Sequence, residues 1–172
     1  DIRDKVKAEV NNSTIAVNTA GVGAINVKAA NRVFLNASAA CIGGGLAGIA
    51  GNVSVNYMEN EVSAKVFNSS FGASDKRAGS IDIEANNSAT IESYIGTVAA
   101  GAVAAGVSVG VNTLDGKVTT VVDGSNLYAN GNINIKANEA RTVSQVSVTA
   151  AGGAVAVGGN VMYVSSGQLL PT

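Results

Sequence analysis

The sequence predicts an all-β protein, a right-handed parallel β-helix in which short coils stack along one axis. Three observations lead to this class. Hydrophobic residues make up 47% of the 172 residues, yet aromatic residues make up only 4% and tryptophan is absent. The sequence also repeats itself three times. Within each repeat, apolar and polar residues alternate with a period of two, as they do in half-buried strands.

The composition favours a thin core spread along a line. A compact globular core normally depends on a few large aromatic side chains, whereas the apolar residues here are mainly valine, isoleucine and alanine. The net charge is −1, from 11 basic and 12 acidic residues. Because no basic stripe is visible, we expect neither nucleic-acid binding nor attraction to an anionic membrane.

The longest apolar stretch, Gly96–Val111, is shorter than the roughly 18 residues that a membrane-spanning helix needs. It is also rich in glycine and alanine. We therefore expect a pair of buried strands here and no membrane insertion.

The repeat is about 56 residues long. Val6-Lys7-Ala8-Glu9-Val10 is followed 56 positions later by Val62–Val66 and then by Val118–Val122. A second marker, Gly23–Ala29, recurs as Gly79–Ala85 and Gly131–Ala137, so the third copy lacks four residues before it. A third marker, Val53–Asn56, matches Val109–Asn112 and, more loosely, Val161–Val164.

Residues 1–172 therefore form a single repeat array, with repeats at about 5–60, 61–116 and 117–168. Asp1–Asp4 resembles the end of a preceding copy, and Leu169-Leu170 resembles the start of the next. We expect the chain to be a fragment of a longer protein or a subunit that stacks end to end.

Alternation within the markers predicts which side chains face the core. Val6, Ala8 and Val10 should point inward, with Lys5, Lys7 and Glu9 outward. The same pattern predicts Ile25, Val27 and Ala29 inward and Asn26 and Lys28 outward. The predicted core ladders are Val6/Val62/Val118, Ile25/Ile81/Ile133, Val27/Ile83/Ile135 and Val53/Val109/Val161.

Turns are predicted where asparagine, glycine and serine cluster, because asparagine and glycine tolerate a positive φ. These clusters are Asn11-Asn12-Ser13, Asn86-Asn87-Ser88 and Asp123-Gly124-Ser125. The glycine- and alanine-rich stretches Ser38–Gly51, Ile95–Gly106 and Ala150–Gly159 are predicted to be strands. They contain too much glycine for helices, and small side chains let neighbouring backbones pack closely.

Six strand-like segments in each repeat predict about two coils of three strands, although three shorter coils are also compatible with the pattern. The alternative fold is an antiparallel β-sandwich or meander. The segment Val109–Val122 suggests this alternative, because two strands there flank Thr113–Gly116, a suitable four-residue hairpin loop.

The Gly-x-Ile-x-Ile-x-Ala units and the asparagine turns resemble the large exoproteins of Gram-negative two-partner secretion, the filamentous-haemagglutinin-like adhesins and leukotoxin-like repeat proteins. The resemblance covers nearly the whole chain. It implies a β-helical filament on the outer bacterial cell surface or outside the cell, export through an outer-membrane transporter, and adhesion to a host cell-surface or matrix protein or glycan. The secretion domain of that family is not evident in this sequence.

Catalytic chemistry has little support. Histidine is absent, which excludes Ser-His-Asp and Cys-His arrangements within this chain. Cys41 is expected to be a small buried apolar residue, with Thr97 and an alanine or valine at its equivalent positions. Asp82 and Glu84, with Glu92 nearby, should share an outward face, but their counterparts in the other copies are not acidic. We interpret these three residues as a solvated strand face.

Three further motifs do not identify a ligand-binding site. Gly43–Gly48 matches Gly-x-Gly-x-x-Gly, but no helical sequence follows it, as a dinucleotide site requires. Calcium-binding nonapeptides are missing. Acceptor sequences for N-glycosylation occur at Asn11, Asn12, Asn36, Asn52, Asn68 and Asn86.

The sequence thus predicts a non-enzymatic structural or adhesive segment of a secreted or surface exoprotein, a stiff spacer or a broad binding surface. We identify no catalytic, cofactor-binding or metal-binding residues. One alternative is a self-assembling extracellular filament subunit with end-to-end self-association. The other is a carbohydrate-active β-helix enzyme that uses Asp82 and Glu84.

Overall fold

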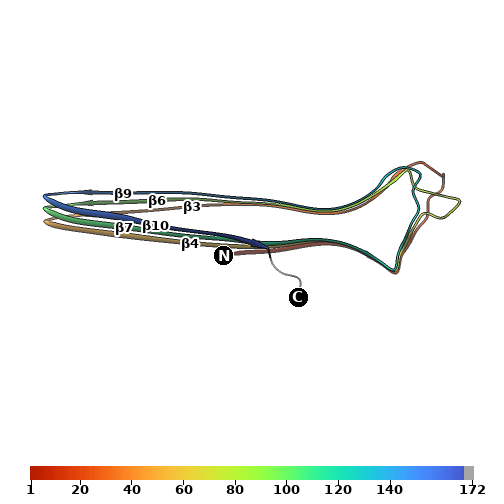
Figure 1. Cartoon of the computed structure of the whole chain (residues 1–172), viewed down its shortest axis with the longest axis horizontal. Coiled ribbons are helices and arrows are strands. Elements are labelled where there is room, and N and C mark those ends of the chain that lie inside the picture. The colour runs from red at the N-terminus through yellow and green to blue at the C-terminus, as the bar shows by residue number, and fades with distance from the viewer. Residues whose placement is uncertain (169–172) are drawn as a thin grey trace.

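A computed structural model describes residues 1–168 and shows a parallel β-helix. The described residues contain strands, turns and bends, and no helix. Two long layers of parallel strands lie face to face, and they converge at one end of the elongated molecule (Figure 1). The predicted all-β solenoid is therefore confirmed.

Three parallel sheets build the molecule. The first contains β1 (Ile2–Asn11), β4 (Ala47–Phe67), β7 (Val103–Asp123) and β10 (Val155–Gln168). The second contains β3 (Ala24–Gly44), β6 (Ser80–Ala100) and β9 (Ile133–Gly152). The third is short and contains β2 (Thr14–Ile15), β5 (Ser70–Phe71) and β8 (Asn126–Leu127).

Each repeat forms one coil, which corrects the expected two or three coils per repeat. Val6 pairs with Val62, and Val62 pairs with Val118, so one turn of the solenoid takes 56 residues. The short segments expected from the sequence merge into strands such as β4 and β6, each 21 residues long. The alternation of inward and outward side chains continues through them without a turn of the chain.

The shorter third repeat is also confirmed. Phe71 pairs with Leu127, 56 positions on, whereas Ile81 pairs with Ile133, only 52 positions on. The four missing residues therefore come from the loop between the short sheet and β9.

A serine corner recurs in every coil at the end of the first sheet. Asn12, Asn68 and Gly124 adopt positive φ angles of 48°, 47° and 57°. The serine after each of them accepts or donates hydrogen bonds between coils. For example, the Ser13 amide donates to Ser69 Oγ at 3.1 Å, and the Ser69 amide donates to Ser125 Oγ at 3.1 Å.

Two of the three predicted turns, at residues 11–13 and 123–125, are thereby confirmed. The third was wrong: Asn86-Asn87-Ser88 lies inside β6, where the Asn87 side chain faces the interior and is 4% exposed. The equivalent corner in the second coil is at Asn68 instead.

The glycine- and alanine-rich stretches are strands, as predicted, but each also contains a reversal of the chain. Two-residue connections at 45–46, 101–102 and 153–154 join the second sheet to the first. The layers come close here. A Cβ atom on Gly43 would lie 2.3 Å from the Ile49 carbonyl oxygen, so only glycine fits.

The antiparallel alternative is wrong. Thr113–Gly116 does not form a hairpin loop but lies inside β7, paired in parallel with Tyr57–Asn60 of β4. Every strand pair of the described residues is parallel.

All four predicted ladders are in register across the coils. Three of them face the interior, where Val62, Ile81 and Ile83 are fully buried. In the last coil Ile133 and Ile135 are 43% and 50% exposed, because no further coil covers them within the described residues. The fourth ladder was wrong as a core prediction: Val53 and Val161 face outward, 67% and 58% exposed.

The core is divided along the molecule into three clusters. The largest lies around Phe71, Val62 and Ile83, next to the short sheet. A second surrounds Met58 and Leu114, and a third consists of small residues near the reversals. Leu169-Leu170, predicted to begin another copy, lies outside the described residues.

Candidate interaction surface

The molecule has two parts with opposite surface character. The tip segment comprises residues 38–57, 94–113 and 146–165, which are equivalent in the register of the coils. The base segment comprises residues 1–37, 58–93 and 114–145. All 11 basic and 12 acidic residues lie in the base segment, and the tip segment has none.

The outer faces of the base segment carry charged rows that run across the coils. Lys5, Glu61 and Lys117 form a row on the first sheet, in which Lys5 Nζ lies 2.8 Å from the Glu61 carboxylate. The row on the second sheet repeats the pattern with Lys28, Glu84 and Lys136, and Lys28 Nζ lies 3.4 Å from Glu84. Opposite charges therefore alternate from one coil to the next, which supports the observed register.

The Lys5 contact affects the acid strength of Glu61. The hydrogen bond from Lys5 is the main cause that lowers the pKa of Glu61 below its ordinary value. Partial burial acts in the opposite direction, and the charges of Lys5, Lys117 and Lys65 add to the lowering.

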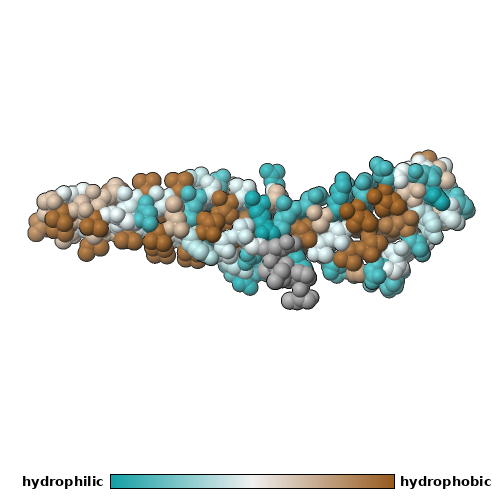
Figure 2. Space-filling view, viewed as in Figure 1, coloured by the Kyte–Doolittle hydropathy of each residue, from teal (hydrophilic) through white to brown (hydrophobic). Residues whose placement is uncertain are grey.

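The outer faces of the tip segment carry aliphatic rows instead. Among residues 1–168, 21 large apolar side chains are exposed and 17 of them lie in this segment; two of the 17, Met162 and Val164, hold inward positions of the uncovered last coil. Ile42 is 82% exposed on the second sheet, Ile49 is 79% exposed on the first, and Leu46 at the reversal is 89% exposed. Figure 2 shows apolar side chains projecting from both outlines of the narrow end, whereas hydrophilic side chains line the outline of the other part.

The interior of the tip segment combines small apolar side chains with hydrogen-bonded polar ones. Thr97 Oγ1 and Ser108 Oγ, on opposite sheets, lie 2.7 Å apart, and Ser108 Oγ lies 2.9 Å from Thr149 Oγ1. Asn56 Nδ2 donates to Asn112 Oδ1 of the next coil at 2.7 Å. Ser108 and Asn112 are fully buried. Most large aliphatic side chains of the tip segment thus face outward, whereas those of the base segment, such as Ile81 and Ile83, face inward.

Tyrosines mark the boundary between the two segments on both outer faces. Tyr57 on β4 donates its hydroxyl hydrogen to Glu59 at 3.1 Å, and its ring lies 5.4 Å from the Arg3 guanidinium carbon. Tyr94 on β6 donates to Glu92 at 3.5 Å. Both hydroxyls therefore point toward the charged base segment.

These tyrosines lie close together along the long axis, offset by about two residues because β4 and β6 run in opposite directions. The inward Asn56 and Ser93, which precede Tyr57 and Tyr94, contact each other across the interior at 3.5 Å. Tyr163 continues the row of Val55 and Val111 in the last coil.

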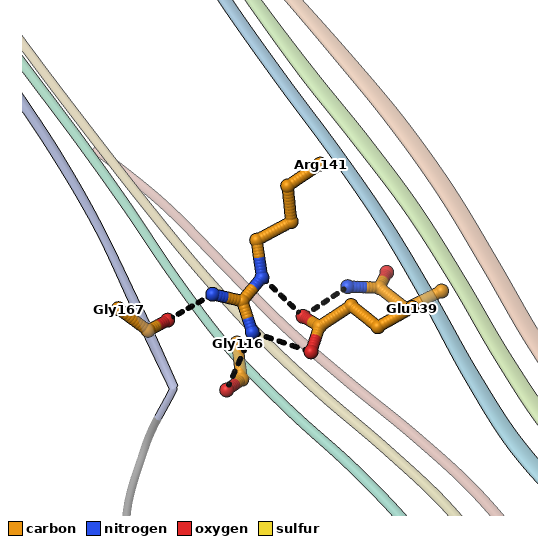
Figure 3. A network of polar contacts seen from close by, with 5 residues as sticks. Gly116, Glu139, Arg141 and Gly167 are labelled. Carbon is orange, nitrogen blue, oxygen red and sulfur yellow. Dashed lines mark hydrogen bonds and ion pairs between the residues drawn. The ribbon is translucent and has the colours of Figure 1, made fainter.

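A charged pair lies inside the last coil. Arg141 binds both carboxylate oxygens of Glu139 and the Gly167 carbonyl oxygen (Figure 3), with its Nε 2.6 Å from Glu139 Oε1. The hydrogen bond to Glu139 is the main cause that raises the pKa of Arg141. Gly116 leaves room for this pair, because a Cβ atom there would lie 2.1 Å from Glu139 Oε1.

The acidic residues singled out from the sequence do not form a paired site. Asp82, Glu84 and Glu92 all face outward on β6, but each contacts a neighbouring coil. Asp82 accepts from Asn134 at 2.7 Å, Glu84 pairs with Lys28, and Glu92 accepts from Asn36 at 3.5 Å. Their contacts are those of a stacked strand face.

Cys41 faces the interior as expected, partly buried against the small residues of the tip. It pairs with Thr97, as predicted, but the third position is Thr149, where alanine or valine was expected. The Gly43–Gly48 motif forms the end of β3, the reversal and the start of β4, so a strand follows it.

Among the acceptor asparagines, Asn11, Asn12, Asn36 and Asn68 are exposed. Asn86 faces outward on β6 and is half-buried, while Asn52 points inward and donates to the Gly96 carbonyl oxygen at 3.4 Å. Within residues 1–168, no three acidic or cysteine side chains gather as a metal-binding group would. The described chain also has no helix of the length and hydropathy that a membrane-spanning helix needs.

The outward aliphatic rows are the feature that the sequence-based interpretation missed, although the sequence contains a signal for them. Val53 and Val62 are separated by nine positions, an odd number. In one continuous strand they must face opposite sides. Val62 belongs to the predicted core, so Val53 had to point outward unless the strand was interrupted between them.

Comparison of the chain with protein-family models, with curated proteins and with solved structures gives no match.

Proposed function

We propose that this chain is a structural and adhesive repeat segment of a secreted or cell-surface bacterial exoprotein. The observation that carries the proposal is the unbroken register of the stacked coils, which gives an elongated body with two broad outer faces. Backbone hydrogen bonds join adjacent strands of 21 residues over their whole length, which makes the body stiff, as a spacer requires. The family resemblance of the sequence points in the same direction.

Adhesion would use the outer faces of the base segment, where charged and polar side chains stand in rows. The Lys28/Glu84/Lys136 row and the Lys5/Glu61/Lys117 row have the same composition on opposite faces. A protein or glycan partner that binds one face need not contact the other, so the two rows offer matched variants.

The test is adhesion of chain-coated beads to cultured epithelial cells, matrix proteins and a glycan panel. We expect saturable binding. One triple variant changes the row on the second sheet (Lys28→Ser, Glu84→Ser, Lys136→Ser), and the other changes the row on the first sheet (Lys5→Ser, Glu61→Ser, Lys117→Ser). One of the two variants should lose binding and the other should keep it. Beads that bind none of these targets better than uncoated beads would contradict the adhesive role.

A filament subunit is the second candidate. The outer edges of β3 and β9 are unpaired within the described residues, and open sheet edges template further pairing. Electrostatic repulsion opposes the stacking of two copies. In-register stacking of two copies would place Lys117 against Lys5 and Lys136 against Lys28, which are like-charge pairs. Sedimentation across a concentration series, at low and high salt, tests this candidate. Filaments that form at low salt would favour it over the adhesive monomer.

A further inference from the structure

We propose that the tip segment inserts into the hydrocarbon region of a lipid bilayer, while the base segment stays in water. The inference goes beyond the proposed function, because it assigns a lipid partner to a part of the chain that the adhesive role does not use. It rests on four independent features of the tip segment, taken in turn below.

The first feature is the distribution of apolar surface around the tip segment. Both outer faces and the reversal between them are aliphatic, with Ile42, Leu46 and Ile49 each more than three-quarters exposed. A single protein partner covers one face, whereas a lipid environment surrounds all of them. Monomeric soluble proteins rarely expose apolar surface of such extent without a binding role.

The second feature is the polar interior. Strands embedded in lipid place apolar side chains outward and polar side chains inward. Outward aliphatic side chains occur in all three coils of the tip segment, and Ser108 bonds to Thr97 and Thr149 inside. Three large apolar side chains, Ile95, Met162 and Val164, also hold inward positions. The interior polar side chains do not have to leave their partners when the outer faces enter lipid, so insertion exposes no new polar side chains there.

The third feature is that the tip segment has no charged residue over a length close to the thickness of the hydrocarbon region. In β4 the outward apolar row extends over nine residues, from Ala47 to Val55. At roughly 3.3 Å per residue they extend about 26 Å, close to the hydrocarbon thickness of about 30 Å. Charged side chains are costly at that depth, and none occurs in the tip segment.

The fourth feature is the level of the tyrosines. Tyr57, Tyr94 and Tyr163 all lie where the apolar rows end, and the first two donate hydrogen bonds toward Glu59 and Glu92. Tyrosine is enriched at membrane–water interfaces, where the ring lies at headgroup level and the hydroxyl meets water. These rings would mark the depth of insertion on both faces.

Lipid also requires pairing for the backbone groups at the two open edges of the tip segment. An adjacent coil in register satisfies them, so inserted copies should lie edge to edge. The like-charge contacts that stacking creates in the base segment, Lys117 with Lys5 and Lys136 with Lys28, oppose it in water. We therefore expect association to accompany membrane binding and to be weak without it.

The chain lacks tryptophan, so single tryptophans report one site each. Val53→Trp places the reporter on the outer face of the tip segment, and Val121→Trp places a matched reporter on the outer face of the base segment. With neutral phosphatidylcholine vesicles, we expect the chain to float with the lipid. The Val53→Trp emission should shift to the blue and be quenched by brominated acyl chains, and the Val121→Trp emission should not change.

Charge variants test the same claim without a reporter. The triple variant Ile49→Glu, Val107→Glu and Val148→Glu changes three outward positions in three different rows, and we expect vesicle binding to fall at least about tenfold. Val121→Glu, beside Lys65 on the base segment, should bind vesicles like the parent chain. Circular dichroism checks that both variants retain the β spectrum.

Two results would overturn the proposal. One is a folded parent chain that does not float with vesicles. The other is a blue-shifted Val53→Trp emission that appears without lipid, rises with protein concentration and accompanies a dimer in sedimentation. That result would assign the aliphatic faces to a second copy of the chain. Neither result depends on host adhesion, so the membrane inference and the adhesive proposal can fail separately.

Discussion

The base segment and the tip segment share one backbone and differ in which side chains face inward. Both consist of the same continuous strands, β4 and β6 among them, with the same register between coils. In the base, Ile81 and Ile83 face inward and are fully buried; in the tip, Ile42 and Ile49 face outward. The comparison teaches that the ladder of backbone hydrogen bonds sets the coil, and that hydrophobic burial is not needed along its whole length.

The two segments therefore depend on different interactions. The base is stabilised mainly by removing aliphatic surface from water. The tip has a core of alanine, serine, threonine and asparagine, and its two layers approach closely because glycine occupies positions such as Gly43. Hydrogen bonds between the layers take the place of aliphatic contacts there. Substitutions at matched positions can separate the two contributions.

The largest effect is expected from the base core. Ile83→Ala removes fully buried methyl groups and leaves a cavity, so the free energy of unfolding should fall by about 2–5 kcal/mol. Val107→Ala, on the outer face of the tip, should change it by less than about 0.5 kcal/mol. Urea unfolding followed by circular dichroism measures both. Equal losses would remove the distinction between the segments.

The next effect concerns the polar interior of the tip. Asn112→Ala removes the acceptor of Asn56 and leaves that amide buried, which should cost about 1–3 kcal/mol. Thr113→Ala, one residue further and facing outward, is the matched control and should cost less than about 0.5 kcal/mol. If the two variants unfold at the same urea concentration, the interior network does not stabilise the tip.

A smaller effect is expected for the charged pair in the last coil. Arg141→Met leaves Glu139 without its main partner inside the coil, which should cost about 1–2 kcal/mol at this partly open position. Changing both residues (Glu139→Gln, Arg141→Met) should cost less than the sum of the single changes. A double-mutant cycle measures the difference, and strict additivity would show that the pair is not coupled.

The smallest effect is the acid sensitivity of the base surface. Because the folded pKa of Glu61 lies below its ordinary value, the pair with Lys5 stabilises the fold above the unfolded pKa of 4.5. That contribution is lost as the pH falls through the lowered folded value. Glu61→Gln should cost about 0.3 kcal/mol at pH 7, since the pair is exposed to solvent.

The measurement for this prediction is the urea midpoint from pH 7 to pH 3. The difference between the parent chain and Glu61→Gln should shrink as the pH falls below about 4.5. Lys5→Met, which removes the main cause of the lowered pKa, should behave in the same way. A difference that stays constant over this range would contradict the assigned role of Lys5.

The sequence predicted the class of the fold and most of the register, because side chains with a period of two report directly on strand faces. The pairs Val6–Val62 and Ile25–Ile81 followed from the 56-residue period alone. The sequence did not reveal the length of the strands. Asn86-Asn87-Ser88 inside β6 and Thr113–Gly116 inside β7 looked like turns, whereas the neighbouring coils hold them in extended strands.

The same misinterpretation hid the aliphatic faces. Val53 was assigned to the core because β-branched residues normally lie inward, and no local rule distinguishes an inward valine from an outward one. The parity of a continuous strand decides the question, and continuity depends on contacts between residues 56 positions apart. The Glu139–Arg141 pair was equally hidden, since its counterparts Asn87 and Ala89 carry no charge.

The central claim is that the alternation in the tip segment runs with apolar side chains outward. Single cysteines at positions 53, 54, 55 and 56, each with Cys41→Ser, test it through the rate of labelling by a water-soluble maleimide. Fast labelling at 53 and 55 with slow labelling at 54 and 56 is the predicted result. Slow labelling at 53 and 55 with fast labelling at 54 and 56 would place Val53 and Val55 inside. That result would contradict both the outward aliphatic faces of the tip segment and the membrane proposal built on them.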